Sequence, residues 1–422
     1  MYRYSPGRIP NHVAEADNIV VTNATVIDGT GADPFVADVT VLGGRIVNLG
    51  PRTEPDDGAK VIEGAGMFLT PGLIDCHVHL TGLEGRDPFR RNIDKYPSVR
   101  LLRATRDAIR ILQAGFTTVR HLGHGVADQA QALKEAIADG LVAGPRMQTC
   151  GWAMSQTGGH GNLHDWPYQL VEDLRPRSAF VDGPDDCRKF VRRQLGDGAE
   201  WIKVYTSEGL ISSPDHLIDI PNYSMAELEA IVDEAHRRGA RVAAHSTGLE
   251  GSLNAVKAGV DTLEHGPHAP DDTLIDLMAQ NGTTLVPTLD VFEYAAFKGE
   301  SYGWPDWVSE RARRWLPGRR EMVAAAAEAG ITIAVGSDSG QPPRGGKGAA
   351  EIGALVRAGL SPLQALSAAT KGGAKALGID DLGVVALGAR ADLVLWRINP
   401  LESPDSLSED GVVERVIQAE VQ

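Results

Sequence analysis

The pattern of hydrophobic and polar positions changes twice along this chain of 422 residues. From about residue 18 to 70, short runs rich in β-branched residues are separated by Asp-Gly and Gly-Gly turns, which predicts strands without helices. From Gly72 to about Gly378, short apolar runs alternate with amphipathic stretches, which predicts strands and helices in alternation. Beyond Gly378, in 383–396 and 412–417, the β pattern returns.

The central part of the chain predicts a closed barrel of parallel strands. Eight apolar runs have the length of a strand, and they begin near Leu73, Thr117, Arg146, Trp201, Arg241, Thr262, Thr284 and Thr332. Helical stretches such as 99–113, 185–195 and 224–238 lie between them, and Ser224 and Ser361 each begin a capping box. Eight βα units make a (β/α)8 TIM-like barrel the simplest fold. A doubly wound open sheet is the alternative, but no Gly-x-Gly-x-x-Gly follows the first strand.

We therefore predict an α/β fold with two parts. Residues 71–378 would form the (β/α)8 TIM-like barrel. Residues 1–70 and 379–422 would form a small β-sandwich domain built from both chain ends. This organisation requires the two ends to meet in space, although the whole barrel separates them in the sequence.

Composition and charge exclude several classes of protein. A formal net charge of -15 argues against a nucleic-acid partner, which requires clustered Lys and Arg. The three cysteines are far apart and include no Cys-x-x-Cys pair, which excludes a disulfide framework and predicts a reducing, cytoplasmic location. The chain has no apolar run of ~18 residues and no apolar segment near its start, so we expect no membrane span and no signal peptide. We expect a small-molecule substrate and a homo-oligomer, with neither nucleic acid nor membrane as a partner.

Two histidines lie at the end of the first predicted barrel strand. Pro71-Gly72 makes a turn, and a buried strand follows in which His77 and His79 face the same way. Two neutral imidazoles so placed can share a metal ion. A bare His-x-His is more often an ordinary polar pair on a half-exposed strand, so a metal site requires ligands from elsewhere in the chain.

Further candidate ligands lie at other strands, near the carboxyl ends where such barrels keep their chemistry. His245, His265 and Asp338 end the fifth, sixth and eighth predicted strands, and Lys203 lies within the fourth. Each has an ordinary alternative, such as a helix-capping Asp or a core His. A buried lysine is costly unless it is paired or chemically altered. The occurrence of all four in one alternating series favours a common site.

On these residues the chain resembles the metal-dependent amidohydrolase superfamily, nearest to its imidazolonepropionase-like and prolidase-like dipeptidase branch. The resemblance runs over essentially the whole chain. It rests on His245 and on the motifs TPGLIDCHVH (70–79), GFTTVR (115–120), TGGHG (157–161), WIKVY (201–205), EHG (264–266), GSD (336–338) and GARADLV (388–394). It implies a binuclear metal centre, usually zinc, in the mouth of the barrel.

The resemblance also implies six metal ligands, namely His77, His79, Lys203, His245, His265 and Asp338. The two histidines of the first strand would hold the buried metal together with Asp338, and the other two histidines would hold the more exposed metal. Lys203, carboxylated on its amine by carbon dioxide, would bridge the metals, since a carbamate between two dications replaces an unpaired buried cation. A neutral lysine beside a single metal is the alternative.

Three residues are candidates for catalytic roles. Asp338 would accept the proton of the attacking water and pass it to the leaving nitrogen. Tyr205, two residues beyond Lys203 on the same face of the strand, and His160, in the Gly-rich 157–161 loop, could donate to the developing oxyanion. For both, plain packing or loop structure is the alternative.

Two departures from the family pattern affect substrate recognition. His121 stands where relatives often carry Asp, and we interpret it, with nearby His124, as supporting the site from behind the ligands. The 339–346 loop is also unlike the histidine-containing loop of many relatives. The metal chemistry is unaffected by either departure.

The segment 292–315 is rich in aromatic residues and is followed by arginines. We take Phe292, Tyr294, Trp304 and Trp307 as candidate substrate contacts. Aromatic rings with nearby guanidinium groups suit a substrate with an apolar body and a carboxylate. The alternative is a helix that packs its aromatics on the barrel and exposes its arginines to solvent.

These observations predict a binuclear metal-dependent hydrolase that cleaves an amide, either a C-terminal peptide bond or an N-acyl amino acid with an apolar or aromatic group. A first alternative keeps the fold and changes the reaction to a cyclic amide, a carbamate, an ester or a deamination. A second is a non-catalytic barrel that acts as a binding protein, but a complete ligand set argues against it.

Overall fold

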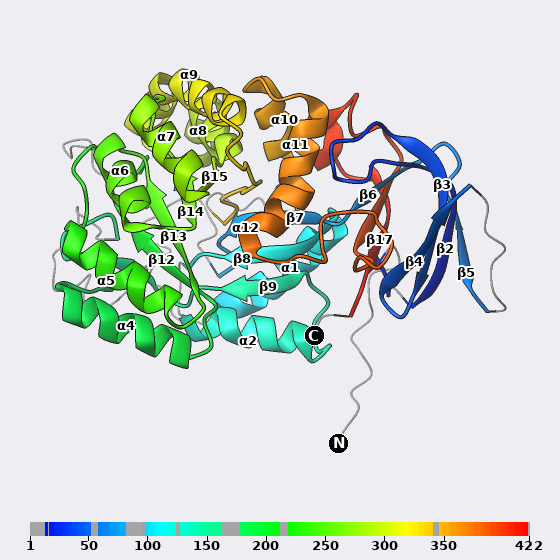
Figure 1. Ribbon diagram of the computed structural model, residues 1–422, viewed down its shortest axis with the longest axis horizontal. Helices are drawn as coiled ribbons and strands as arrows, with labels where there is room; N and C mark the ends of the chain where they lie inside the picture. The colour runs from blue at the N-terminus through cyan, green and yellow to red at the C-terminus, as the bar shows by residue number, and fades with distance from the viewer. Residues whose placement is uncertain are drawn as a thin grey trace.

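The structure is a computed structural model that describes residues 13–15, 17–51, 58–81, 96, 98–123, 127–161, 178–211, 218–340 and 346–420. The described residues form a β domain made by both chain ends and a larger part with parallel strands and helices (Figure 1). In Figure 1 strands β2 to β5 lie at one end of the molecule, and helices α4 to α7 lie outside strands β12 to β15.

The β domain is one eight-stranded sheet with the order β1-β17-β16-β6-β2-β3-β4, in which β5 also pairs with β2. Its strands are β1 Val13–Glu15, β2 Asn18–Val26, β3 Phe35–Leu42, β4 Arg45–Gly50, β5 Lys60–Glu63, β6 Phe68–Pro71, β16 Leu393–Trp396 and β17 Val413–Gln418. Strands β6 and β16 pair antiparallel, which brings the two chain ends together as predicted. The same edge of β2 pairs with two strands in succession, its first half with β5 and its second half with β6, so the sheet branches at β2. The domain has its own apolar core, and its predicted boundaries at residues 70 and 379 stay a prediction.

The larger part contains parallel strands in two sheets, ordered β7-β8-β9 and β11-β10-β12-β13-β14-β15. These strands are β7 Leu73–Val78, β8 Phe116–His121, β9 Arg146–Thr149, β10 Ala153–Ser155, β11 Ser178–Phe180, β12 Trp201–Tyr205, β13 Arg241–Ser246, β14 Thr262–His265 and β15 Thr284–Val286. Every residue of β7, β8 and β12 is buried, as expected for parallel strands covered on both faces. The predicted α/β class with a separate β domain is confirmed.

The segment expected to be the eighth strand is irregular. It makes single bridges, between Ile333 and Leu285 of β15 and between Ser339 and Val78 of β7, and it thereby joins the two sheets on one side, which is consistent with a TIM-like barrel. The segment lies close to β15, where only glycine fits, since a Cβ at Gly336 would lie 2.4 Å from Val286 Cγ1. The sequence also did not predict β10 and β11, whose three residues each are too few for a period to be recognised.

The described helices are α1 Ser98–Gln113, α2 Ala127–Ala138, α4 Pro184–Gly196, α5 Met225–His236, α6 Leu249–Ala258, α7 Asp272–Asn281, α8 Leu289–Tyr302, α9 Asp306–Glu328, α10 Ala350–Arg357, α11 Pro362–Ser367 and α12 Gly373–Leu377, with a π-helical turn at Ala368–Gly372. The capping boxes at Ser224 and Ser361 are confirmed. Among the helices that the structure describes, none combines the length and the apolar character needed to cross a membrane.

Candidate metal centre and active site

One cavity brings together all the predicted metal ligands and catalytic residues. It is lined by His77, His79, His160, Lys203, Tyr205, His245, His265 and Asp338, among others. Most of these side chains come from the carboxyl ends of β7, β12, β13 and β14 or from segments that follow strands, whereas Lys203 lies in the middle of β12. The parallel arrangement accounts for this, because equivalent ends of parallel strands lie on the same side.

The closest cluster of potential ligands is formed by His77, His79 and Asp338. The Nε2 atoms of the two histidines are 3.2 Å apart, and Asp338 Oδ1 lies 3.1 Å from His79 Nε2 and 3.6 Å from His77 Nε2. The three ligand atoms lie within 4.8 Å of one another, so this group could hold a metal ion. Burial alone would raise the pKa of Asp338, but the two imidazoles hold that pKa below its ordinary value.

The other two histidines lie next to this group. The ring of His265 is 5.0 Å from that of His77 and 4.6 Å from that of His245, measured between centroids. Burial, reinforced by the nearby Lys203 ammonium, lowers the pKa of His77 to about 4. Burial also holds the pKa values of His245 and His265 well below the ordinary value. All three rings are therefore neutral at pH 7, the form in which imidazole binds metals.

Hydrogen bonds to backbone oxygens fix the orientation of two rings. His79 Nδ1 donates to the carbonyl oxygen of Gly123 at 3.0 Å, so its Nε2 faces the cluster. His245 Nε2 contacts the carbonyl oxygen of Glu208 at 3.3 Å, which leaves its Nδ1 as the possible ligand atom. Outer partners of this kind set the tautomer of metal-binding histidines.

Backbone strain is concentrated at the site. His265 and Asp338 have φ values of 70° and 49°, and Thr288, whose Oγ1 lies 2.7 Å from His265 Nδ1, has a φ of 51°. Such conformations cost non-glycine residues on the order of 1–3 kcal/mol each and persist where the surroundings impose them. These strained conformations lower local stability, and they orient the candidate ligands His265 and Asp338 as well as Thr288, which contacts His265.

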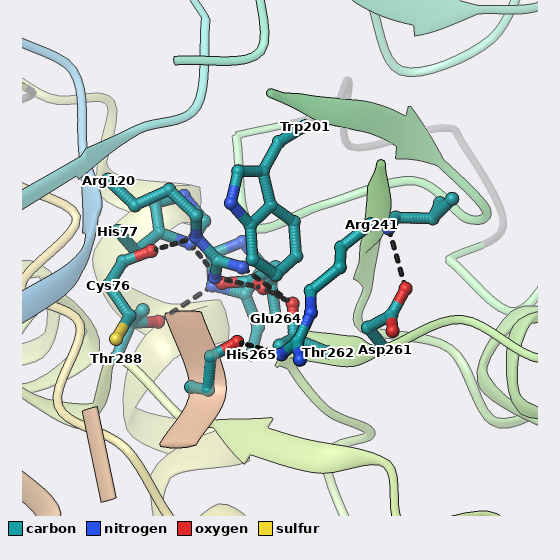
Figure 2. Close-up of polar contacts among 12 residues, drawn as sticks. Cys76, His77, Arg120, Trp201, Arg241, Asp261, Thr262, Glu264, His265 and Thr288 are labelled. Atoms are coloured by element: carbon teal, nitrogen blue, oxygen red, sulfur yellow. Dashed lines mark hydrogen bonds and ion pairs between the residues drawn. The ribbon is translucent and has the colours of Figure 1, made fainter. Parts of the chain in front are cut away.

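Behind His77 lies a fully buried charge network that the sequence analysis did not assign. Glu264 Oε2 contacts His77 Nδ1 at 2.7 Å, and Arg120 Nη2 donates to Glu264 Oε1 at 2.7 Å (Figure 2). Arg120 also donates from Nε to the carbonyl oxygen of Cys76 and lies over the Trp201 ring. Burial raises the pKa of Glu264, but Arg120 and His77 more than offset this and leave it at about 2. Both residues lie within the motifs GFTTVR and EHG, and the available signal was a charged residue within each of two predicted barrel strands.

A second unassigned carboxylate links the two segments that carry the closest ligands. Asp75 Oδ1 accepts hydrogen bonds from the backbone N–H groups of His77, at 3.1 Å, and Ser337, at 3.0 Å. Asp75 is buried and precedes His77 on β7, whereas Ser337 precedes Asp338. One side chain thus sets the distance between β7 and the turn that bears Asp338.

Lys203 is buried in β12 and points into the cavity. Its side chain is 1% exposed, and its Nζ has no hydrogen-bond partner among the described residues. Burial lowers the pKa of Lys203 to about 8, so the neutral amine is more populated than in an exposed lysine. An unpaired buried ammonium is costly. This orphaned amine among neutral imidazoles and a carboxylate fits a site built to hold metal ions and to neutralise the lysine.

His160 and Tyr205 lie on the other side of His245. The His160 ring stacks on the His245 ring at 4.3 Å, and Tyr205 lies 4.9 Å from His160 and 5.3 Å from His245, measured between centroids. The stack leaves no room for a side chain at position 209, because a Cβ on Gly209 would lie 2.4 Å from His160 Cε1. Both predicted oxyanion donors are thus within the cavity and next to candidate ligands.

The four predicted substrate contacts fall into two groups. Phe292 and Trp304 line the cavity, whereas Tyr294 and Trp307 are not among the described residues that line it. Trp307 packs against the guanidinium of Arg311, 4.7 Å from the ring centroid.

His121, which stands where relatives often carry Asp, lies behind His79 with the ring centroids 6.4 Å apart. Its Nε2 is 3.1 Å from Thr81 Oγ1, and it is not among the described residues that line the cavity. His124 and residues 341–345 lie outside the described residues.

Comparison with known proteins agrees with this geometry. The chain is 33% identical to ochratoxinase of Aspergillus niger over 97% of this chain and 88% of that protein, whose crystal structure matches with a TM-score of 0.83. A prolidase complexed with N-methylphosphonate-L-proline is 31% identical, with a TM-score of 0.86 over 96% of this chain and 98% of that one. A Xaa-Pro dipeptidase with bound methionine in the active site is 30% identical, with a TM-score of 0.82 over 94% of this chain and 99% of that one.

The model of the amidohydrolase family matches residues 68–419, which include the whole site. This family is metal-dependent, and the His77, His79 and Asp338 group is present in the chain. The predicted resemblance, including the prolidase-like branch, is confirmed. The chain belongs to the amidohydrolase family and is a hydrolytic enzyme that acts on C–N bonds.

Proposed function

We propose that the enzyme is a binuclear metallohydrolase that cleaves an amide next to a free carboxylate, either a C-terminal peptide bond or an N-acyl amino acid with an apolar or aromatic group. The observation that carries this proposal is a cavity lined both by a candidate metal-ligand set and by apolar residues, among them Phe292 and Trp304. The relatives support it. The prolidase binds N-methylphosphonate-L-proline, in which a tetrahedral phosphonate is attached to proline. This ligand resembles the tetrahedral intermediate of dipeptide hydrolysis.

For the metals, we propose that His77, His79 and Asp338 hold one ion and that His245 and His265 hold the other. Lys203, as a carbamate, would bridge them, which removes an unpaired buried cation. Imidazole and carboxylate donors suit Zn²⁺, and we propose zinc as the metal. When bound, such a pair supplies an acidified water and polarises the carbonyl oxygen of a substrate.

The remaining chemistry belongs to side chains of the cavity. Asp338 is ionised, because His77 and His79 hold its pKa low, and its side chain is 23% exposed to the cavity. It can therefore accept the proton of the attacking water and pass it to the leaving amide nitrogen, which must be protonated to depart. Phe292 and Trp304 exclude water from the apolar side of the substrate.

Tyr205 can donate its phenol proton to the substrate carbonyl oxygen as charge develops there. We expect Tyr205→Phe to lower kcat by about 100- to 1,000-fold with little change in KM, as for the loss of one oxyanion donor. Tyr223→Phe is the matched control, because Tyr223 is also buried and its hydroxyl has no hydrogen-bond partner among the described residues. Steady-state kinetics of both variants decide the matter. A loss below tenfold in Tyr205→Phe would assign this ring to packing and leave His160 as the donor.

The test of the proposed function is the rate with matched pairs of substrates. We expect N-acyl amino acids and dipeptides with a free carboxylate to have kcat/KM values about tenfold or more above those of their amidated counterparts, since a charged hydrogen bond contributes roughly 1.5–3 kcal/mol. Trp304→Ala should lower kcat/KM for large apolar substrates and spare small ones. Trp307→Ala, outside the described cavity wall, is the matched control.

Equal rates on both members of each pair would contradict a carboxylate requirement. That result would favour a cyclic amide or a carbamate as the substrate, or a deamination, each of which the same metal centre could catalyse. A uniform loss in both tryptophan variants would mean that the aromatic segment acts through packing alone.

A further inference from the structure

The two candidate metal positions have outer partners of different chemical character. His265 Nδ1 faces the neutral hydroxyl of Thr288, and His245 Nε2 faces a backbone carbonyl oxygen. His77 Nδ1 instead faces the carboxylate of Glu264. All these contacts are buried, so solvent does not screen the difference between the carboxylate partner and the neutral ones.

Glu264 is held in one orientation by partners on both of its oxygens. Oε2 contacts His77, while Oε1 accepts from Arg120 Nη2 and from the hydroxyl of Thr262. Arg120 is itself fixed, because it donates at 2.6 Å to the carbonyl oxygen of Cys76, the residue before His77 (Figure 2). Glu264 and Arg120 are each 0% exposed, so the carboxylate cannot turn away into solvent.

This arrangement determines which nitrogen of His77 carries the proton. A carboxylate only accepts hydrogen bonds, so Nδ1 must donate and Nε2, which faces His79 and Asp338, is left free as a ligand. A carboxylate also makes the imidazole a stronger donor to metal than a hydroxyl or an amide does. Because Arg120 balances the charge of Glu264, the pair acts through orientation and basicity and adds no net charge beside the metal.

We propose that Glu264, held by Arg120, is a positioning residue for His77 and makes the metal position of His77, His79 and Asp338 the tighter of the two. Thr288 is its neutral counterpart for the position of His265. The inference rests on the proposed binuclear centre, and it assigns separate outer residues to separate metals.

Glu264→Gln tests this sharply, because a glutamine cannot satisfy both neighbours. If its oxygen faces His77, its NH2 group opposes Arg120 Nη2, donor against donor. If its NH2 group faces His77, the ring must accept at Nδ1 and carry its proton on Nε2, where the metal would bind. Glu264→Gln combined with Arg120→Met removes both charges, so it leaves no buried charge unpaired if the single variant fails to fold.

The measurement is the pair of Zn²⁺ dissociation constants of the demetallated full-length chain, obtained by competition with a chromophoric chelator. Glu264→Gln should weaken the tighter constant by about 10- to 100-fold and leave the weaker one within threefold. The double variant should weaken the tighter constant by a smaller factor, because without Arg120 the glutamine oxygen can accept from His77 Nδ1 but is a weaker acceptor than a carboxylate. Thr288→Val should weaken only the weaker constant. Thr262→Val, which alters the same network without touching His77, should change neither.

Two further readouts separate positioning from a purely structural role. The visible absorption spectrum of the chain loaded with one equivalent of Co²⁺ should shift in Glu264→Gln and stay unchanged in Thr288→Val. Unchanged dissociation constants together with a lowered melting temperature of the demetallated Glu264→Gln chain would overturn the inference and make the network structural. Wild type that binds a single Zn²⁺ would overturn the binuclear proposal itself, which is a different result.

Discussion

Removal of metal is expected to abolish turnover completely, and the purified protein is expected to carry about two metal ions per chain. The physical reason is that the cavity is lined by five histidines and a carboxylate, with no serine or cysteine nucleophile among the residues described as lining it. Activation of water must therefore come from metal ions. Elemental analysis of the purified protein and activity assays after dialysis against a chelator test both statements.

Restoration provides the control for metal removal. Activity should return when Zn²⁺ is added back to the dialysed protein, while the far-ultraviolet circular dichroism stays unchanged throughout. A stoichiometry near one with full activity would contradict the binuclear proposal and favour a mononuclear, deaminase-like site. Activity that survives exhaustive chelation would contradict metal dependence altogether.

Replacement of Lys203 should be almost as damaging. We expect Lys203→Ala to lower kcat/KM by about 1,000-fold or more and to reduce the metal content, because the proposed bridge contributes several kcal/mol of charge stabilisation. The buried amine has no hydrogen-bond partner among the described residues and has a pKa of about 8, which favours reaction of its neutral form with carbon dioxide. Kinetics and metal analysis of the variant measure the effect.

The carbamate itself can be tested directly. A short carboxylic acid added to Lys203→Ala should restore part of the activity, and labelled bicarbonate should give a carbamate carbon-13 signal in wild type that the variant lacks. Lys347→Ala is the matched control, since Lys347 lies at the surface in an ion pair with Asp410. An unmodified amine in metal-replete, active protein would contradict the bridging role.

The aromatic segment 292–315 shows what the local sequence pattern can predict and what it cannot. Phe292 and Tyr294 lie two positions apart on α8, so a helix turns them to nearly opposite sides. The sequence could therefore have predicted that the two rings do not share one cavity. It could not have predicted which ring faces the cavity, because both faces of α8 bear apolar residues and the orientation depends on packing against α9.

The irregularity of the eighth strand could not have been predicted from the local sequence pattern. Residues 332–339 have the composition of a strand, but the close approach of Gly336 to Val286 and the strained turn at Asp338 arise only when β7 and β15 are in place. Local preference is a weak determinant where neighbouring segments approach this closely.

The sequence by itself determined most of the strands and helices, because these depend on short-range periodicity. The alternation of strands and helices, the capping boxes, the shared face of His77 and His79, and the position of other candidate ligands at predicted strands follow from that periodicity, whereas the full candidate ligand set came from the family resemblance. Only the tertiary structure decided how the ligands are supported. Glu264 lies 187 residues from His77 and 144 from Arg120, and contacts over such separations leave no periodic trace in a single sequence. The buried lysine shows the same limit, since its lack of a partner became evident only when every neighbour was in place.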